Sequence, residues 1–196
     1  MILESIVTTT NLNGEAHMAA FGLRETPDGK FIIAPFKPST SLENMLRTKS
    51  AVVSWTDDVR AFAGVITGRK LHPMNKASVV QGWVLNSALS HVELSLVSVV
   101  DHADRPELTF EVVHSKTHAP FKGFNRAQGA VLEAAVLASR LHMLPAEKIK
   151  AELAYLSIAI DKTAGWRERE AWGWLMAKID AHFGAQTPAL LLKSAP

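Results

Sequence analysis

The stretch IIAPFKPSTSLENMLRT, residues 32–48, joins an apolar strand to a segment with the pattern of a helix. Two prolines break the apolar run before three consecutive hydroxyl residues. Thr40 and Glu43 have the spacing of a capping box, in which the two side chains bond free backbone N–H groups at the start of a helix. Ser39 and Ser41 are alternative caps. The stretch therefore predicts a strand-to-helix junction.

The same junction carries groups that bind phosphate. The first turn of a helix presents unpaired N–H groups and a partial positive charge, and Lys37, Ser39 and Thr40 lie beside it. The sequence has no glycine-rich phosphate loop. Lys122 and Arg126 belong to a second basic cluster, which precedes a long predicted helix. Each of these places is either a solvated helix start or an anion contact.

The first two thirds of the chain have the pattern of an antiparallel sheet. Short segments rich in β-branched and apolar residues alternate with turns such as Asn-Gly at 13–14 and Pro-Asp-Gly at 27–29. Short strands with few helices among them usually close into a barrel or a sandwich. The predicted strands are 4–10, 16–23, 31–36, 51–56, 61–67, 91–101 and 108–116, with helices at 42–48 and 77–89.

A helical region follows, and the pattern changes near Lys122. Asn125 is the expected N-cap of a helix that ends near Leu144, with Gln128 reaching back as in a capping box. Pro145 suits the first turn of a second helix, and a third helix follows. Strands followed by helices predict an α+β fold. The predicted divisions are a sheet domain at 1–121, a helical subdomain at 122–185 and a tail at 186–196.

The composition excludes several classes of protein. The net charge of +2 is too small for a nucleic-acid surface, and the 47% of hydrophobic residues is ordinary for a globular protein. We expect no membrane segment and no secretion signal, because no apolar run is long enough. The absence of cysteine excludes disulfides, thiolate nucleophiles and iron–sulfur clusters. We expect a cytoplasmic protein in which any redox chemistry comes from a bound cofactor.

The eight histidines form no known metal motif. His114 and His118 are four residues apart, a spacing that brings imidazoles together on a helix but not at the end of a strand. The other histidines are scattered, without the acidic partners of a zinc motif. We therefore expect no metal site. We also assign no catalytic residue, because the sequence has no nucleophile-elbow motif.

Four stretches resemble a known superfamily. The stretches are ESIVTTTNLNGEAHMA (4–19), APFKPSTSLENMLRT (34–48), SWTDDVRAFA (54–63) and FNRAQGAVLEAA (124–135). The first three resemble the FMN-binding split β-barrel superfamily, which includes flavin reductases. The fourth resembles the helical C-terminal extension of an uncharacterised branch of that superfamily. The resemblance covers about residues 1–185.

The resemblance implies a Greek-key-like barrel of about six strands, and a homodimer with FMN at the subunit interface. The flavin phosphate would lie at the strand-to-helix junction, and the ring would lie along the first strands. Members of the branch are associated with one-carbon metabolism that uses tetrahydromethanopterin. The predicted FMN-binding residues are Thr8, Thr9, Thr10, His17, Met18, Ala19, Lys37, Ser39, Thr40, Lys122 and Arg126.

Three functional hypotheses follow from the sequence and the resemblance. The first is an oxidoreductase or electron-transfer protein that acts through bound FMN, with a small-molecule redox partner that the sequence does not identify. The second is a non-catalytic flavin- or pterin-binding module, or an assembly partner that docks through its helices. The third is a split barrel without a cofactor.

Overall fold

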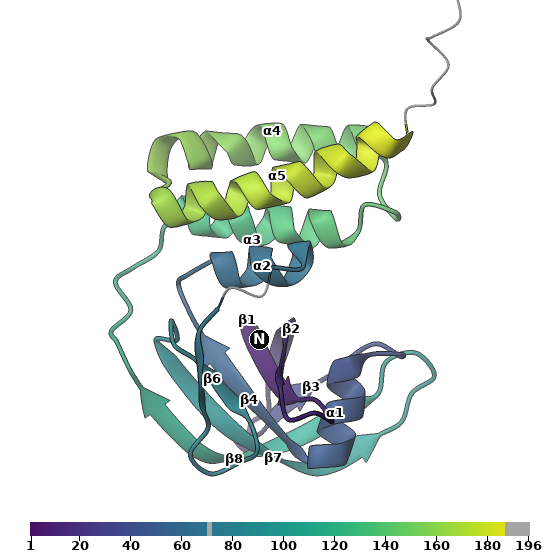
Figure 1. Ribbon diagram of the computed structural model, residues 1–196, viewed down its shortest axis with the longest axis vertical. Coiled ribbons are helices and arrows are strands. Elements are labelled where there is room, and N and C mark those ends of the chain that lie inside the picture. The colour runs from purple at the N-terminus through teal and green to yellow at the C-terminus, as the bar shows by residue number, and fades with distance from the viewer. Residues whose placement is uncertain (70–71, 187–196) are drawn as a thin grey trace, which may run out of the picture.

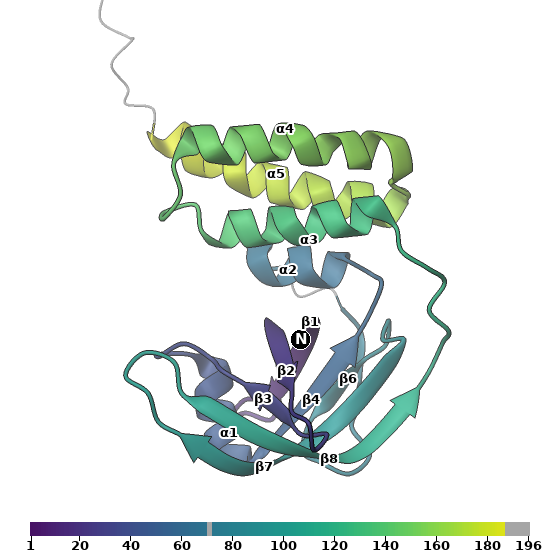
Figure 2. The same ribbon diagram turned by 180° about the vertical axis from the view of Figure 1, so that it is seen from behind.

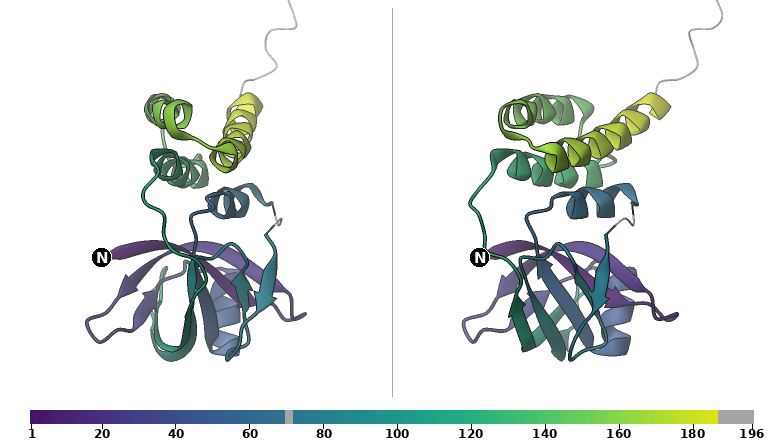
Figure 3. Two further views of the ribbon diagram at one scale, coloured as in Figure 1. Left: turned by 90° about the vertical axis from the view of Figure 1, so that its left-hand side faces the viewer. Right: turned by 60° about the vertical axis from the view of Figure 1, so that its left-hand side comes forward.

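The computed structural model of the chain describes residues 1–69 and 72–186. Figure 1 shows a β-barrel on one side and a layer of three long helices on the other, with α2 between them. The same order is visible from behind and from the side (Figures 2 and 3). The predicted α+β fold is confirmed, and the predicted tail lies outside the described residues from 187 onward.

Six antiparallel strands close the barrel in the order β1-β2-β3-β8-β7-β4, and two further strands form a separate hairpin. The barrel strands are β1 (Ile2–Thr10), β2 (Ala16–Glu25), β3 (Phe31–Ile33), β4 (Ser50–Trp55), β7 (Ser90–Val100) and β8 (Glu107–Thr117). The hairpin strands are β5 (Met74–Lys76) and β6 (Trp83–Leu85). The helices are α1 (Thr40–Thr48), α2 (Arg60–Thr67), α3 (Arg126–Ser139), α4 (Ala146–Thr163) and α5 (Trp166–Gln186).

Alternate residues of each strand fill the barrel, because successive side chains of a strand point to opposite faces. Val7, Val53 and Leu94 are buried inside, with Phe110 from β8. Helix α1 adds Leu42 and Met45 to the same core. The position of α1 against the barrel is therefore fixed by apolar packing next to the strand-to-helix junction.

The outer face of β1, β4 and β7 is polar but buried, because the segment 77–85 covers it. Glu93 accepts hydrogen bonds from the backbone N–H groups of Ser78 (2.7 Å), Val79 (2.6 Å) and Val80 (2.9 Å). Burial raises the pKa of Glu93, but these N–H groups outweigh it and hold the pKa below its usual value. The other strand side chains that bond this backbone are Thr8, Thr10, Ser50 and Ser54.

The predicted helix at 77–89 is wrong because these outward-facing side chains take the backbone groups that a helix would pair internally. Gly82 shows how closely the segment approaches the sheet, since a Cβ there would lie 2.5 Å from a methyl carbon of Val52. The segment instead contains β6 and irregular backbone, and β6 pairs with β5.

The predicted strand at 61–67 is also wrong, because this segment is helix α2. Ala61 and Phe62 pack against the outer face of the barrel, in a cluster with Ile6 and Leu85. Ala63 packs in the opposite direction, into the core of the helical layer. A short run that is apolar on both faces is compatible with a buried strand or a buried helix.

The helical layer packs closely because α3 is rich in alanine. Ala127, Ala130 and Ala134 are buried in one core with Ile149 of α4 and Leu175 of α5. The three helices and α2 thus need one another to bury their apolar faces.

In the described residues, no helix has both the length and the apolar character needed to cross a membrane.

The start of α3 follows the prediction in part. Asn125 is the N-cap, and its side-chain oxygen accepts from the N–H of Ala127 (2.8 Å). Gln128 does not reach back to the cap, because its amide donates to Glu168 of α5 (3.3 Å). The expected capping box is therefore wrong, and Gln128 joins two helices instead.

Arg60 at the start of α2 connects the barrel to α5. Its guanidinium donates to both oxygens of the buried Asp58 (2.8 and 2.6 Å) and to Glu170 (3.1 Å), and it lies 4.4 Å from the ring centre of Trp166. Burial raises the pKa of Asp58, but the hydrogen bonds from Arg60 outweigh it and hold the pKa below its usual value.

Replacing Asp58 with Asn should lower the free energy of unfolding by about 1–3 kcal/mol at pH 7, because a charged hydrogen-bonded pair is lost. The native pKa of Asp58 is lowered, so its stabilising effect is present above the unfolded pKa of about 4 and is lost as the pH falls through the native pKa. Denaturant unfolding from pH 7 to pH 3 measures this. Asp57→Asn is the matched control, and an equal loss in both variants would contradict the account.

Candidate functional site

The strap, residues 34–38, lies between β3 and α1 and is tied to the turn that joins β7 and β8. Lys37 donates from Nζ to the carboxylate of Asp101 and to the carbonyl of His102 (3.0 Å). The backbone N–H of Lys37 donates to the carbonyl of Asp104 (2.8 Å). The hydrogen bond from Lys37 also lowers the pKa of Asp101. The ammonium group of Lys37 is thus held at the β7–β8 turn, on the strap that leads into α1.

Helix α1 is capped by Ser39, whose hydroxyl accepts from the N–H of Leu42 (3.2 Å). Thr40 is the first residue of the helix, and its side chain is exposed. Of the alternative caps, the structure therefore selects Ser39 and leaves the side chain of Thr40 at the surface, next to the first helical turn.

A depression of about 450 Å³, which we call the cup, lies beside α1. Asn44 donates to the hydroxyl of Thr9 (3.1 Å) and to the side chain of Asn11 (2.9 Å). Arg47 donates to the carbonyl of Thr10 and to Asn44 (3.1 Å). These bonds hold α1 against the end of β1. The cup is lined by Asn11, Leu12, Asn13, Thr40, Glu43, Asn44 and Arg47.

A second pocket of about 250 Å³, which we call the slot, lies between the end of the β1–β2 hairpin and α2. Asn11 lines both the slot and the cup, so the two pockets adjoin the same turn. The backbone of α2 lies close to the side chain of His72 at this pocket. A Cβ on Gly64 would be only 2.8 Å from Nε2 of His72. The slot is lined by Asn11, Glu15, Ala16, His17, Met18, Gly64, Val65, Gly68, Arg69, His72 and Met74.

The structure brings some of the predicted binding residues together. Thr40 lines the cup, the hydroxyl of Thr9 and the carbonyl of Thr10 bond the helix residues of the cup, and His17 and Met18 line the slot. Lys37 and Ser39 lie at the adjoining strap and cap.

The remaining predicted residues lie elsewhere. The hydroxyls of Thr8 and Thr10 bond the carbonyls of Trp83 and Gln81, respectively, under the segment that covers the barrel. Ala19 lies in the middle of β2, opposite Val7. The exposed Lys122 belongs to the connection between β8 and α3, which runs along the side of the barrel away from α1 (Figures 1 and 2), and the exposed Arg126 is the first residue of α3.

Asn44 and Arg47 were missed by the sequence analysis. Both belong to the helix whose capping pattern was clear, Arg47 in its last turn, and their spacing of three residues places them on one face of α1. The role of that face follows from its contact with the end of β1. This contact joins residues that are distant in the sequence, so the local pattern does not reveal it.

The histidines gather more than expected. His91 on β7 lies beside His114, with ring centres 5.7 Å apart, and beside His118, with ring centres 5.0 Å apart. The expectation concerned only the spacing of His114 and His118 along the chain. The structure brings each of them beside His91 on the neighbouring strand, which the sequence analysis did not predict.

Two family models match the chain. Residues 3–119 match the N-terminal domain of a protein family of unknown function, DUF447, and residues 125–177 match the second model of the same family. A comparison with curated proteins found no match.

Solved structures with the same fold include flavin-binding proteins. An FMN-bound DUF447 protein from Methanosarcina mazei is 19% identical, with a TM-score of 0.76 over 90% of this chain and 94% of that chain. A 2-nitrobenzoate 2-nitroreductase from Pseudomonas fluorescens is 17% identical, with a TM-score of 0.53 over 59% of this chain and 64% of that chain. An NADH:FAD oxidoreductase from Streptomyces globisporus is 12% identical, with a TM-score of 0.52 over 59% of this chain and 70% of that chain. The predicted resemblance is confirmed as a shared fold.

Replacing Gly64 with Ala should destabilise the protein by about 1–3 kcal/mol, because the new methyl group overlaps His72 and lies 3.1 Å from the carbonyl oxygen of Arg69. Gly129→Ala in α3 is the matched control, since its Cβ meets no atom of the described residues within 4 Å. That variant should gain up to about 1 kcal/mol from helix propensity. Thermal unfolding measures both, and a stabilised Gly64→Ala variant would contradict the close approach at the slot.

Proposed function

Because the chain belongs to the DUF447 family, whose N-terminal model spans residues 3–119, we propose that it is an FMN-binding flavoprotein. The FMN-bound protein of that family from Methanosarcina mazei, which shares the fold over 90% of this chain, supports the proposal. The observation that carries it is the adjacency of the cup and the slot. A polar pocket and a partly apolar pocket meet at Asn11 and suit the phosphate end and the ring end of one ligand.

The cup fits the phosphate of FMN. Arg47 supplies a guanidinium group, Thr40 supplies a hydroxyl, and the first turn of α1 supplies N–H groups and a partial positive charge. Lys37 lies on the adjoining strap. Its pair with Asp101 is solvent-exposed, and such pairs contribute little to stability, so Lys37 exchanges partners at little cost. Glu43 also lines the cup and opposes an anion, so the cations must outweigh it.

The slot fits part of a planar ring. Met18, Val65 and Met74 offer apolar contacts, and the side chains of His17 and Arg69 lie at the same pocket. When bound, the flavin supplies the redox chemistry, while the chain binds it, orients it and limits access of water to one face. We propose an oxidoreductase or electron-transfer role on this basis and assign no catalytic acid or base.

Replacing Lys37 or Arg47 with Ala should weaken FMN binding by about 1–3 kcal/mol, the usual contribution of a charged hydrogen bond, and should hardly affect riboflavin, which has no phosphate. The ratio of the two affinities, measured by flavin fluorescence titration, separates phosphate contacts from a general loss of folding. Lys148→Ala on α4 is the control, because Lys148 forms a comparable exposed pair with Glu152.

Asp101→Asn is the complementary variant, and it should raise the FMN-to-riboflavin ratio because it removes the carboxylate that competes for Lys37. An unchanged ratio in the Lys37, Arg47 and Asp101 variants would contradict the cup as the phosphate site. Lys122 and Arg126, predicted as a second anion contact, would then be the next residues to replace.

A homodimer is the second part of the proposal. The number of exposed valines on β7 and β8 supports it, because exposed apolar side chains are a feature of protein–protein interfaces. The exposed residues are Val97, Val99, Val100, Val112 and Val113. The proposed dimer places the flavin at the subunit interface.

Light scattering of the wild-type chain should give about twice 21.4 kDa. Val99→Glu should give the monomer mass, because it places a charge among these exposed valines. Val136→Glu, at a comparably exposed valine on α3, is the control and should stay dimeric. A monomeric wild type that still holds FMN would contradict the proposed dimer.

A non-catalytic module or assembly partner is the alternative. Exposed apolar residues on the helical layer, including Tyr155 and Trp166, favour it as a docking surface. Reduction of the bound flavin by a nicotinamide cofactor would favour the oxidoreductase. The links to tetrahydromethanopterin and to the cytoplasm stay predictions.

A further inference from the structure

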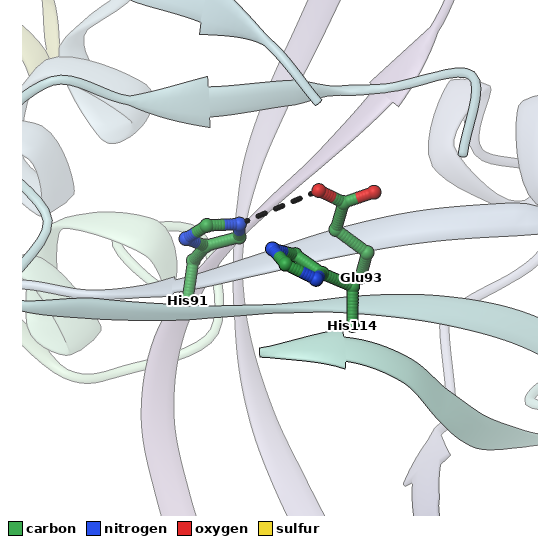
Figure 4. Close-up of side chains that lie close together, drawn as sticks. All are labelled: His91, Glu93 and His114. Atoms are coloured by element: carbon green, nitrogen blue, oxygen red, sulfur yellow. Dashed lines mark ion pairs between the residues drawn. The ribbon is translucent and has the colours of Figure 1, made fainter. Parts of the chain in front are cut away.

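Three side chains, none of which lines the cup or the slot, gather on the outer face of the barrel (Figure 4). His91 and Glu93 are two residues apart on β7, so they project from the same face, while Val92 between them points inward. His114 on β8 lies directly opposite Glu93. A bulge in the β7–β8 pairing follows Glu93, and bulges of this kind often re-aim side chains beside functional sites.

One ring nitrogen of His91 has an ion-pair contact but no hydrogen bond. Its Nδ1 lies 2.8 Å from Nε2 of His118, a hydrogen-bonding distance. Its Nε2 is buried and has no hydrogen-bond partner among the residues that the structure describes. Buried polar atoms without partners are rare, and each one needs an explanation such as a bound ion or water. The side chain is 3% exposed, and its Nε2 is directed at Glu93.

Glu93 has capacity left on the side that faces His91. An ionised carboxylate has about four lone-pair sites, two on each oxygen. Oε2 accepts from both Val79 and Val80, whereas Oε1 accepts a hydrogen bond from Ser78 alone within the described residues. Oε1 is also the oxygen that forms the ion pair with His91 Nε2, at 3.5 Å. A fully buried carboxylate thus presents its less occupied oxygen to the ring nitrogen that has no hydrogen bond.

The spacing suits two ligands of one metal ion. Two ligand atoms about 2.0–2.1 Å from a tetrahedral zinc ion lie about 3.3–3.4 Å apart. The distance between His91 Nε2 and Glu93 Oε1 is 3.5 Å, and the ligand atoms of all three residues lie within 4.8 Å of one another. We propose that His91, Glu93 and His114 bind one divalent transition-metal ion of the zinc class.

The ligand types select the class of ion. Two imidazoles and one carboxylate are typical of zinc and related transition metals, whereas Mg²⁺ and Ca²⁺ prefer an all-oxygen shell. His114 is only half-buried, so water takes the remaining coordination position. His118 is a positioning residue, because its bond to Nδ1 sets the orientation of the His91 ring. Lys116 lies opposite His91 in the register, but its side chain is exposed and its charge is solvated.

Bound metal would also join three parts of the structure. His91 and His114 belong to neighbouring strands, and Glu93 holds the backbone of residues 78–80 against the barrel. Binding to the folded state alone raises stability. The site therefore predicts a thermal stabilisation by Zn²⁺ that does not depend on flavin.

The test is a titration of Zn²⁺ into untagged, chelator-treated protein, with calorimetry and thermal unfolding as readouts. The wild type should bind one equivalent per chain and melt at a higher temperature. His114→Ala should weaken binding by more than about 100-fold, because it removes a ligand, and His118→Ala by about 10- to 100-fold, the usual effect of a residue that orients a ligand. His142→Ala, at an exposed histidine near the end of α3, is the control and should bind as the wild type does.

His114 is half-buried, so its replacement should fold even if changes at the buried His91 do not. Two results would overturn the proposal. One is the absence of stoichiometric Zn²⁺ binding by a folded wild type, which would leave the cluster as a hydrogen-bonded group of histidines and a glutamate. The other is binding that His114→Ala leaves unchanged, which would place the ion elsewhere.

Discussion

Helix α2 is the element on which the arrangement of the molecule depends, because both of its faces are buried. Phe62 packs on the outer face of the barrel, and Ala63 packs into the core of the helical layer. Its first residue, Arg60, bonds Asp58 beneath it and Glu170 of α5. The same helix contributes Gly64 and Val65 to the wall of the slot. The packing that joins barrel and helices therefore also shapes one side of the proposed ring site.

The two other candidate sites lie where polar side chains meet backbone that is not in regular structure. At α1, Asn44 and Arg47 bond the end of β1 and form the cup. On the outer face of the barrel, Glu93 holds residues 78–80 and faces His91. In both places, buried or half-buried polar side chains form hydrogen bonds with backbone groups that regular structure leaves unpaired. Leaving such groups without hydrogen bonds would cost stability. A buried group that is left without a hydrogen bond, such as Nε2 of His91, is the kind that points to a ligand.

The sequence predicts much of the fold because local patterns determine it. The turns at Gly14 and Gly29, the cap at Ser39 and the cap at Asn125 all lie where their residue types predict them. The misassigned segments are those in which tertiary contacts decide. Residues 60–67 are apolar on both faces and fit a buried strand or helix equally, and residues 77–89 are shaped by side chains from strands that are distant in sequence. Asn44 and Arg47 of the cup and the histidine cluster were missed for the same reason, since both depend on strand register and helix placement.

The central claim is that one FMN molecule extends from the cup to the slot around the turn at Asn11. A crystal structure of the chain grown with FMN tests it most directly. The account predicts the phosphate within hydrogen-bonding distance of the first turn of α1 and of Arg47, and the ring against Met18 of β2 and Val65 of α2. A phosphate bound at Lys122 and Arg126, or a ring outside the slot, would contradict it.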